Sequence, residues 1–273
     1  MSQNQDILNS FIEISNKSLD LVSKWRQGSQ EIMSKVNVNG QTDVVTELDC
    51  QIEMNAKELL NIKFPNFEFV GEEGFKGNFE VFSHDYFIID PIDGTKPFVE
   101  GSKDWGISIC CVIGGIPTVA LLNIPDKNIC ITGIVGEGVR INGKPYKISS
   151  NVNRKVGVSP RQLSLVEDCF LDSDFVLKKM SALTPKVAVV ISGEVGSAFY
   201  CPEKGKSASI WDYAAACFLL QEAGGMMRSF QGSSMPYSGD NVIHRGGWIA
   251  AKSDIVFQKV KSFIDTKLQY NCI

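Results

Sequence analysis

Apolar side chains recur at helical spacing along the first part of the chain. They predict a helix from about Gln5 to Val36, in which Gly28 permits a break, and a second helix from about Val44 to Leu60. The tripeptide Phe64-Pro65-Asn66 ends the second helix, because proline cannot extend it. The chain is therefore expected to begin with two amphipathic helices.

The pattern then changes to short β-branched or apolar runs that Gly, Pro and Asn interrupt. The strands expected in this part are Phe67–Val70, Tyr86–Ile89, Gly106–Ile113, Pro117–Asn123 and Asn128–Ile134. Val139 and Ile141 alternate with polar residues and lead into Asn142-Gly143, a dipeptide typical of a hairpin turn. This part is therefore expected to form an antiparallel sheet flanked by the two helices.

From about Ser150 onward, strand and helix patterns alternate. The expected elements are a strand at Val156–Ser159, a helix at Leu163–Leu171, an apolar run at Val187–Ile191, a helix at Trp211–Ala223, a strand at Trp248–Ala251 and a final helix. A boundary near residue 150 separates an N-terminal α+β half, residues 1–150, from a C-terminal α/β half, residues 151–273. Without a linker between them, the halves should pack closely as a layered α/β (α+β) sandwich.

Composition limits the class of protein and of partner. A hydrophobic fraction of 44% and a charged fraction of 21% fit an ordinary globular protein. The net charge of −4, with Lys and Arg scattered, argues against nucleic acid or an anionic membrane as the partner. The eight cysteines show no C-x-x-C spacing, and the sequence contains no long apolar span or signal peptide, so a cytoplasmic protein with reduced thiols is expected.

The hexapeptide Asp90-Pro-Ile-Asp-Gly-Thr95 is the strongest chemical signal. It follows the apolar run Tyr86–Ile89 and holds two carboxylates three residues apart. Such carboxylates repel each other, so a cation between them is the best explanation. Gly94 permits a sharp turn, and Thr95 adds a hydroxyl group beside backbone N–H groups. Hard oxygen ligands next to an N–H-rich turn indicate a Mg²⁺-assisted phosphate site.

Three further acidic elements are weaker signals. Gly71-Glu72-Glu73-Gly74 follows the strand that ends at Val70, Asp212 opens a helix, and Asp49 stands at the start of the second helix. Taken singly, these acids also fit a solvated turn, a helix cap and a favourable helix-dipole charge. Only their combination with the hexapeptide makes a metal site the better interpretation.

Other catalytic chemistries find little support. The only histidines, His84 and His244, do not lie near a Ser or Cys in a nucleophile pattern. The stretch Gly138–Lys144 has the spacing of a phosphate-binding P-loop. However, Pro145 replaces the Ser or Thr that the motif requires, and the stretch predicts a hairpin rather than a strand followed by a helix.

The acidic elements occur together in the order and spacing of a known family. Val70–Gly74, Asp90–Thr95, Trp211-Asp212 and Glu222–Gly225 together resemble the inositol monophosphatase superfamily over about residues 40–255. The resemblance implies the five-layered αβαβα sandwich of the inositol monophosphatase and fructose-1,6-bisphosphatase type. It also implies a Mg²⁺-dependent, often lithium-sensitive phosphomonoesterase that acts on a small phosphorylated metabolite. Many relatives are homodimers.

The resemblance also implies a set of metal ligands. Glu72, Asp90 and the carbonyl of Ile92 would hold one Mg²⁺, and Asp90, Asp93 and Asp212 a second, with Asp90 bridging the two. Two ions per site, or three, are expected. A pair of ions of this kind can stabilise both the attacking and the leaving oxygen of an in-line displacement.

Catalytic and substrate roles follow from the same resemblance. Thr95, hydrogen-bonded to Asp49, would orient and help deprotonate the attacking water, with Glu72 as a further catalytic residue. The N–H groups of Gly94 and Thr95 would bind phosphate oxygens. Lys96 would face the substrate.

The identity of the phosphate ester is less determined. Lys96 and the segment Val158–Arg161 resemble the bisphosphate nucleotidase branch, which favours a 3′(2′),5′-bisphosphate nucleotidase. An inositol-1-monophosphatase and a histidinol-phosphate phosphatase are the alternatives within the superfamily, and a non-catalytic phosphate- or metal-binding regulator is the alternative from another class. Lys204 and Lys206 are further candidate substrate cations, although all three lysines also fit a solvated surface.

Overall fold

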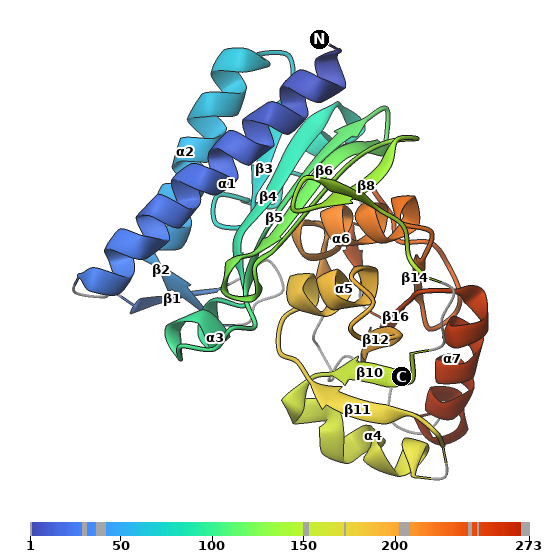
Figure 1. The fold of residues 1–273 in the computed structure, drawn as a ribbon. Coiled ribbons are helices and arrows are strands. Elements are labelled where there is room, and N and C mark those ends of the chain that lie inside the picture. Colours follow the sequence, from blue (N-terminus) through green and yellow to red (C-terminus); the bar gives the residue numbers. More distant parts are fainter. Residues whose placement is uncertain are drawn as a thin grey trace.

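The computed structural model describes residues 2–28, 32–36, 42–149, 153–171, 173–201, 208–239, 242–244 and 246–268. In this part of the chain, helices and sheets alternate in five layers (Figure 1). The three helical layers are α1 (Gln3–Gln27) with α2 (Glu47–Lys63), α5 (Leu183–Ile191) with α6 (Ile210–Glu222), and α4 (Leu163–Phe170) with α7 (Asp254–Leu268). One large sheet lies between each two successive helical layers, which confirms the expected αβαβα sandwich.

The first sheet has seven strands within the described residues, in the order β3-β4-β5-β6-β7-β8-β9. They are β3 (Glu68–Gly71), β4 (Tyr86–Asp93), β5 (Gly106–Ile113), β6 (Ile116–Ile124), β7 (Ile129–Ile134), β8 (Gly138–Ile141) and β9 (Lys144–Tyr146). β3 runs parallel to β4, and the other neighbours are antiparallel. Because β3 and β4 are parallel, their C-terminal ends lie at the same edge of the sheet.

The second sheet is mixed and has the order β11-β10-β12-β16-β14. Its strands are β10 (Lys155–Val158), β11 (Val176–Lys179), β12 (Ser197–Tyr200), β14 (Met226–Ser229) and β16 (Trp248–Ala251). β10 runs parallel to β11 and β12, whereas β16 is antiparallel to β12 and β14. Two small antiparallel pairs complete the described strands: β1 (Ile32–Val36) with β2 (Thr42–Thr46), and β13 (Ala208–Ser209) with β15 (Ile243–His244).

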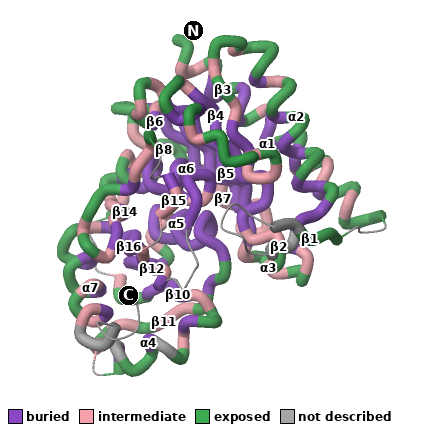
Figure 2. Tube along the Cα trace, turned by 180° about the vertical axis from the view of Figure 1, so that it is seen from behind, coloured by how far each residue is buried: buried purple, intermediate pink, exposed green. Residues whose placement is uncertain are grey.

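Apolar side chains fill the spaces between the layers. One cluster, which includes Phe11 and Ile52, packs α1 and α2 onto the first sheet, and a second, which includes Leu219, surrounds α5 and α6 between the sheets. A third cluster around Phe257 packs α4 and α7 onto the second sheet. Figure 2 shows buried residues concentrated on the strands and on α6. α6 is apolar around most of its circumference because both sheets cover it.

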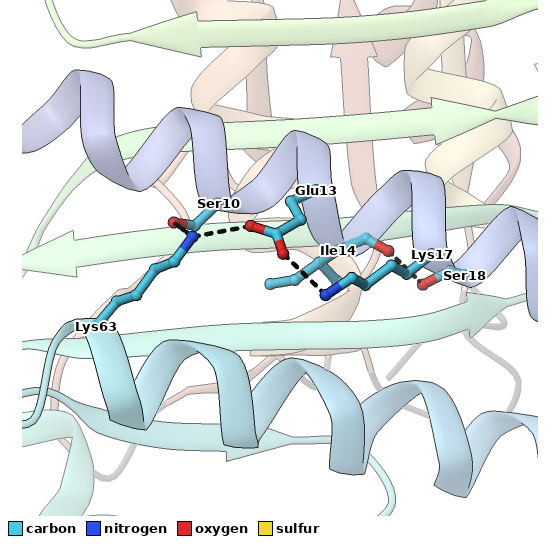
Figure 3. Close-up of polar contacts among 6 residues, drawn as sticks. All are labelled: Ser10, Glu13, Ile14, Lys17, Ser18 and Lys63. Carbon is cyan, nitrogen blue, oxygen red and sulfur yellow. Dashed lines mark hydrogen bonds and ion pairs between the residues drawn. The ribbon is translucent and has the colours of Figure 1, made fainter.

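Charged side chains join α1 and α2 at their exposed surface (Figure 3). Glu13 accepts hydrogen bonds from Lys17 Nζ and from Lys63 Nζ, each at 2.8 Å, and Lys63 Nζ also donates to Ser10 Oγ at 3.4 Å. The bonds from Lys17 and Lys63 lower the pKa of Glu13 to about 2. No helix in the described part of the chain combines the length and the apolar character that crossing a membrane would require.

The predicted helix from Gln5 to Val36 is wrong beyond Gln27. Gly28 takes an extended conformation after α1, and Ile32–Val36 forms β1. The predicted start of the second helix at Val44 is also wrong, because residues 42–46 form β2 and pair with β1. β-Branched residues favour the strand there, and Thr46 then caps α2.

Most other sequence-predicted elements are confirmed within a residue or two, although β4 extends beyond its predicted run to Asp93. β5 has the predicted bounds, and Asn142-Gly143 forms the turn between β8 and β9 rather than a phosphate-binding loop. The apolar run Val187–Ile191 is the second part of α5. The short strands β11, β12, β13, β14 and β15 were not predicted from the sequence, because each is completed by pairing with another segment of the chain.

Candidate metal centre

The end of β4 brings two aspartates to one place. Asp90 and Asp93 are buried, and the pairing of β4 with β5 is irregular between them. In a regular strand, residues three apart would face opposite sides of the sheet. A local irregularity at Pro91, which has no N–H group to donate, lets both carboxylates reach the same site.

Asp212 joins this pair from α6. Carboxylate oxygens of Asp90, Asp93 and Asp212 all lie within 4.8 Å of one another. Asp212 stands in the first turn of α6, and its Oδ2 accepts a hydrogen bond of 2.6 Å from the Ser209 N–H. Ser209, rather than Asp212, is the N-cap of α6, and Asp212 at the third helical position completes the capping box with one oxygen while it lies in the acidic cluster.

A hydrogen bond fixes the start of α6 against the first sheet. Ser108 Oγ donates to the carbonyl of Trp211 at 3.2 Å, and Ser108 is the partner of Asp90 in the pairing of β5 with β4. The residue before Asp212 is thus attached directly beside Asp90. Together with the packing of α6 on the first sheet, this contact brings together two segments that lie more than a hundred residues apart.

Glu72 reaches the same edge of the sheet by strand pairing. Gly71 at the end of β3 pairs with Ile89, so the next residues in each strand, Glu72 and Asp90, are brought together. The Glu72 N–H extends the pairing by donating to the Ile89 carbonyl at 3.2 Å. The charge of Glu72 acts on both Asp90 and Asp93.

Burial and mutual repulsion dominate the electrostatics of the site. Burial, followed by the charges of Glu72, Asp93 and Asp212, raises the pKa of Asp90 well above its ordinary value. Burial also raises the pKa of Asp93 to about 6, although a hydrogen bond from the Thr184 N–H acts in the opposite direction. The cluster is therefore costly to ionise without a compensating cation.

The residues present fit a hard divalent cation. Among the described residues, Asp90 Oδ1 is buried and accepts no hydrogen bond. A buried carboxylate oxygen without a donor calls for a positive ligand, and a set consisting only of oxygens suits Mg²⁺. Glu72, Asp93, Asp212 and the carbonyl of Ile92 are the further groups that could share such an ion with Asp90.

Thr95 and Asp49 also lie together, as expected. Thr95 Oγ1 lies 3.3 Å from Asp49 Oδ1 and 3.1 Å from the carbonyl oxygen of Ile92, and its single proton can be donated to either. The other oxygen of Asp49 accepts hydrogen bonds from the Thr46 N–H at 2.8 Å and from Thr46 Oγ1 at 2.6 Å. Thr46 thereby orients the carboxylate towards Thr95.

Gly94 makes the turn between β4 and the short helix α3 (Thr95–Val99). Its φ of 90° is a conformation that other residues adopt only with strain, and a Cβ atom there would lie 2.9 Å from the Asp104 carbonyl oxygen. Lys96 points to the surface of α3, where its Nζ lies 3.8 Å from Glu100 Oε1. The other two candidate substrate cations, Lys204 and Lys206, lie outside the described residues.

Lys186, a buried cation near the acids, was not among the residues predicted from the sequence. Its Nζ donates to Ser159 Oγ at 2.6 Å and lies 5.9 Å from the centroid of the Tyr200 ring. Burial lowers the pKa of Lys186 to about 8, while the charges of Asp93 and Asp104 act in the opposite direction. A lysine at the head of the apolar run Val187–Ile191 was the available signal.

Glu53 and Thr184 were also missed. Glu53 in α2 accepts hydrogen bonds from the turn that carries Glu72, and the Thr184 N–H donates to Asp93 Oδ2. Neither residue stands in a motif of its own. Both act through contacts between elements that are distant in the sequence.

Comparison with known proteins agrees with this geometry. A model described as the inositol monophosphatase family matches residues 4–262. Inositol monophosphatase 1 of Solanum lycopersicum is 28% identical over 252 residues, which are 87% of this chain and 89% of that protein. The inositol monophosphatase of Mesembryanthemum crystallinum is 32% identical over 208 residues, which are 72% of this chain and 76% of that protein.

Solved structures share the fold along almost the whole chain. The crystal structure of an IMPase/NADP phosphatase complexed with Mg²⁺ and phosphate has a TM-score of 0.81 at 19% identity and covers 99% of both chains. That of a Staphylococcal IMPase-I complexed with products gives a TM-score of 0.81 at 18% identity, again over 99% of both chains. The family model spans nearly the entire sequence and the solved structures share its fold, so the chain belongs to the inositol monophosphatase family, whose members are phosphatases that hydrolyse phosphomonoesters.

Proposed function

We propose that this protein is a Mg²⁺-dependent phosphomonoesterase that removes the 3′- or 2′-phosphate from a small bisphosphorylated nucleotide. The observation that carries the metal-dependent reaction is the convergence of Asp90, Asp93 and Asp212, with oxygens within 4.8 Å of one another and a buried Asp90 oxygen that accepts no hydrogen bond among the described residues. The charge of Glu72 also acts on Asp90, and a cation among these acids would offset their mutual repulsion.

The acids would hold the ion or ions, and Mg²⁺ is the metal of the family. Bound there, it supplies Lewis-acid activation of water and neutralises charge on the phosphoryl and leaving oxygens. In our proposal Glu72, Asp90 and the Ile92 carbonyl share one ion, and Asp90, Asp93 and Asp212 share a second. The requirement for a cation is supported by the raised pKa values of Asp90 and Asp93.

Thr95 and Asp49 are proposed to move the proton of the attacking water. Thr95 Oγ1 can accept that proton while it donates its own to Asp49 Oδ1, 3.3 Å away. The two hydrogen bonds from Thr46 keep Asp49 oriented during this transfer. The N–H groups of Gly94 and Thr95 are proposed to donate to the phosphate oxygens, where the turn after β4 opens α3.

Lys186 supports a substrate with a second anionic group. A buried ammonium group is energetically costly, and a phosphate that approaches it would offset part of that cost. A solved structure with this fold is an IMPase/NADP phosphatase complexed with NADP and Ca²⁺, and NADP carries a phosphate on an adenosine ribose. We therefore favour a nucleotide bisphosphate, with Lys186 near the phosphate that is not cleaved.

A panel of phosphate esters tests the reaction and the substrate. Phosphate release is measured at fixed Mg²⁺ from adenosine 3′,5′-bisphosphate, inositol 1-phosphate, histidinol phosphate and fructose 1,6-bisphosphate, with an EDTA arm for each. We expect turnover that EDTA abolishes and a kcat/KM at least about tenfold higher for the nucleotide, equivalent to ~1.4 kcal/mol. If no ester is hydrolysed, the proposal that the protein is a phosphatase is refuted. If the kcat/KM for the nucleotide is less than about tenfold higher than for the other esters, the proposed substrate is refuted.

A lysine variant tests the second anionic group. Lys186→Met should lower kcat/KM for adenosine 3′,5′-bisphosphate more than for inositol 1-phosphate, because only the nucleotide offers a second phosphate. Lys179→Met is the control, since Lys179 is exposed at the end of β11. Equal losses on both substrates in Lys186→Met would contradict the proposed contact.

Inositol monophosphate is the second candidate substrate. Several relatives that match most of this chain are named inositol monophosphatases. If the chain shares their substrate, inositol 1-phosphate should lead the panel, and Lys186→Met should leave its kcat/KM nearly unchanged.

A further inference from the structure

A carboxylate from α2 holds the turn that carries Glu72. Glu53 Oε2 accepts a hydrogen bond of 2.7 Å from the Glu73 N–H, and Glu53 Oε1 accepts one of 2.8 Å from the Gly74 N–H. Glu53 is 8% exposed. Hydrogen bonds to a buried charged acceptor are among the stronger ones in proteins. The turn is thus fixed from the side of α2 by both oxygens of one side chain.

The glycines on both sides of the turn make this close approach possible. A Cβ atom at Gly74 would lie 2.6 Å from Glu53 Oε1, and one at Gly71 would overlap the Glu53 carboxyl group. Neither glycine has a positive φ. The space needed by Glu53, rather than an unusual backbone torsion, therefore explains why glycine stands at both positions.

A cavity borders the same turn. It has a volume of about 440 Å³ and lies between α2, β3 and the 3₁₀ turn Phe79–Ser83, with Glu53, Gly71 and Gly74 in its wall. Phe75 also lines the cavity, and its ring centroid lies 5.6 Å from that of Trp211. On the cavity side, Glu53 holds the N–H groups of Glu73 and Gly74, while the Phe75 N–H closes the turn by donating to the Gly71 carbonyl at 3.1 Å.

We propose that Glu53 is a positioning residue that sets the geometry of Glu72 at the metal centre. This inference rests on the proposed metal-dependent function. Glu53 bonds the two residues that follow Glu72, while the Glu72 N–H is bonded to Ile89 of β4. The backbone is thus held immediately before and after the acid. Loss of the two hydrogen bonds to Glu53 should therefore let the Glu72 carboxylate move relative to Asp90.

Metal binding provides a direct readout of this role. Mn²⁺, used as a probe for the Mg²⁺ site, is titrated into the full chain and its free concentration is followed by electron paramagnetic resonance. Glu53→Gln keeps the size of the side chain but places an NH₂ group opposite one of the two backbone N–H groups. We expect the Mn²⁺ dissociation constant to rise about 10- to 100-fold, the usual effect of losing a residue that orients a metal ligand.

Two further variants separate positioning from folding. Gly74→Ala disturbs the same contact from the turn side and should weaken Mn²⁺ binding in the same direction, so it provides the test if Glu53→Gln does not fold. Glu68→Gln is the control, because Glu68 is exposed and lines the same cavity without a hydrogen bond to the turn among the described residues. It should bind Mn²⁺ as the wild type does.

A double variant asks whether Glu53 acts through Glu72. In a Glu72→Gln background, Glu53→Gln should cause little further loss of Mn²⁺ affinity, because the ligand that it positions is already impaired. The inference about Glu53 would be overturned if Glu53→Gln bound Mn²⁺ as tightly as the wild type. It would also be overturned if the double variant lost as much Mn²⁺ affinity as the two single variants combined. Neither result would affect the proposed function. A wild-type protein that binds no Mn²⁺ and releases no phosphate with Mg²⁺ would instead overturn the proposed function, and this inference with it.

Discussion

Replacing Asp93 by Asn is expected to stabilise the metal-free protein while it weakens Mg²⁺ binding and phosphate release. Asp93 is buried, so its charge loses its hydration in the fold but keeps it in the unfolded chain, and the charge of Glu72 adds repulsion in the fold. Asn has nearly the same shape, and its carbonyl oxygen can still accept the hydrogen bond from the Thr184 N–H. The substitution therefore removes a buried charge and leaves most contacts in place.

The pKa of Asp93 sets the magnitude. It is raised from 3.8 to about 6. At 1.36 kcal/mol per pH unit, this difference destabilises the folded state by about 3 kcal/mol at neutral pH. For a chain of this length, each kcal/mol corresponds to roughly 2 °C in Tm, so Asp93→Asn should raise the Tm in EDTA by about 6 °C.

The pH dependence has a definite sign. Between pH 3.8 and about 6 the folded state binds more protons at Asp93 than the unfolded state, so the free energy of unfolding of the wild type falls as the pH rises through this window. Well above pH 6, Asp93 is ionised in both states, and its charge lowers the free energy of unfolding of the wild type by the full amount. The difference between Asp93→Asn and the wild type should therefore be largest near pH 8 and small near pH 4.

Thermal unfolding followed by circular dichroism, at pH 4.5 and pH 8 in EDTA and in Mg²⁺, checks these expectations. Asp20→Asn, an exposed change on α1, is the control for loss of one negative charge. Mg²⁺ at ten times its dissociation constant should stabilise the wild type by about 1.4 kcal/mol and Asp93→Asn by less. A lower Tm for Asp93→Asn than for the wild type at pH 8 in EDTA would refute the view that the buried charge of Asp93 destabilises the metal-free fold.

Other variants test separate parts of the structure. Thr95→Val should lower kcat by about a hundredfold or more without weakening Mn²⁺ binding, because it removes the hydroxyl group that would transfer the proton. Thr95→Ser keeps the hydroxyl group and should retain most of the wild-type kcat. Equal kcat values for the two variants would exclude the hydroxyl group from proton transfer. In Lys63→Met, the Glu13 pKa measured by NMR should rise from about 2 towards 4.5, and a value that stays at about 2 would contradict the contact in Figure 3. Leu219 is fully buried between the sheets, so Leu219→Ala should lower the free energy of unfolding, measured by urea denaturation, by about 2–5 kcal/mol. Leu171 is 72% exposed, so Leu171→Ala should change this free energy by less than about 0.5 kcal/mol.

The strands of the first sheet were predictable because local residues define them. Gly106–Ile113 is a long apolar run between punctuating residues, and it forms β5 with the same bounds. The strand Ile32–Val36 was not predictable in the same way. It is short, and it owes its conformation to pairing with Thr42–Thr46 rather than to its own pattern of side chains. Helical spacing that continues from α1 by chance was therefore taken as part of one helix.

The acids of the candidate site were also predictable, because a motif places them at sheet and helix ends. The groups that hold them were not. Glu53, Thr184 and Ser108 have ordinary sequence surroundings, and each acquires its role only when α2, α5 or β5 packs against the site. Lys186 differs, since a charged residue at the head of an apolar run is a signal that can be read without a structure.

The hydrogen bonds around the acids explain how the fold keeps repelling charges together. Asp93 Oδ2 accepts the Thr184 N–H and Asp212 Oδ2 accepts the Ser209 N–H, so for each of these acids a backbone donor fixes one oxygen. Glu53 differs because both of its oxygens accept backbone N–H groups, which suits it to holding a turn rather than a cation. Asp90 Oδ1, at the centre, is buried and accepts no hydrogen bond from the described residues. Since backbone donors fix the outer acids and the central oxygen has none, a cation would gain most from binding at Asp90 and would need little rearrangement of its neighbours.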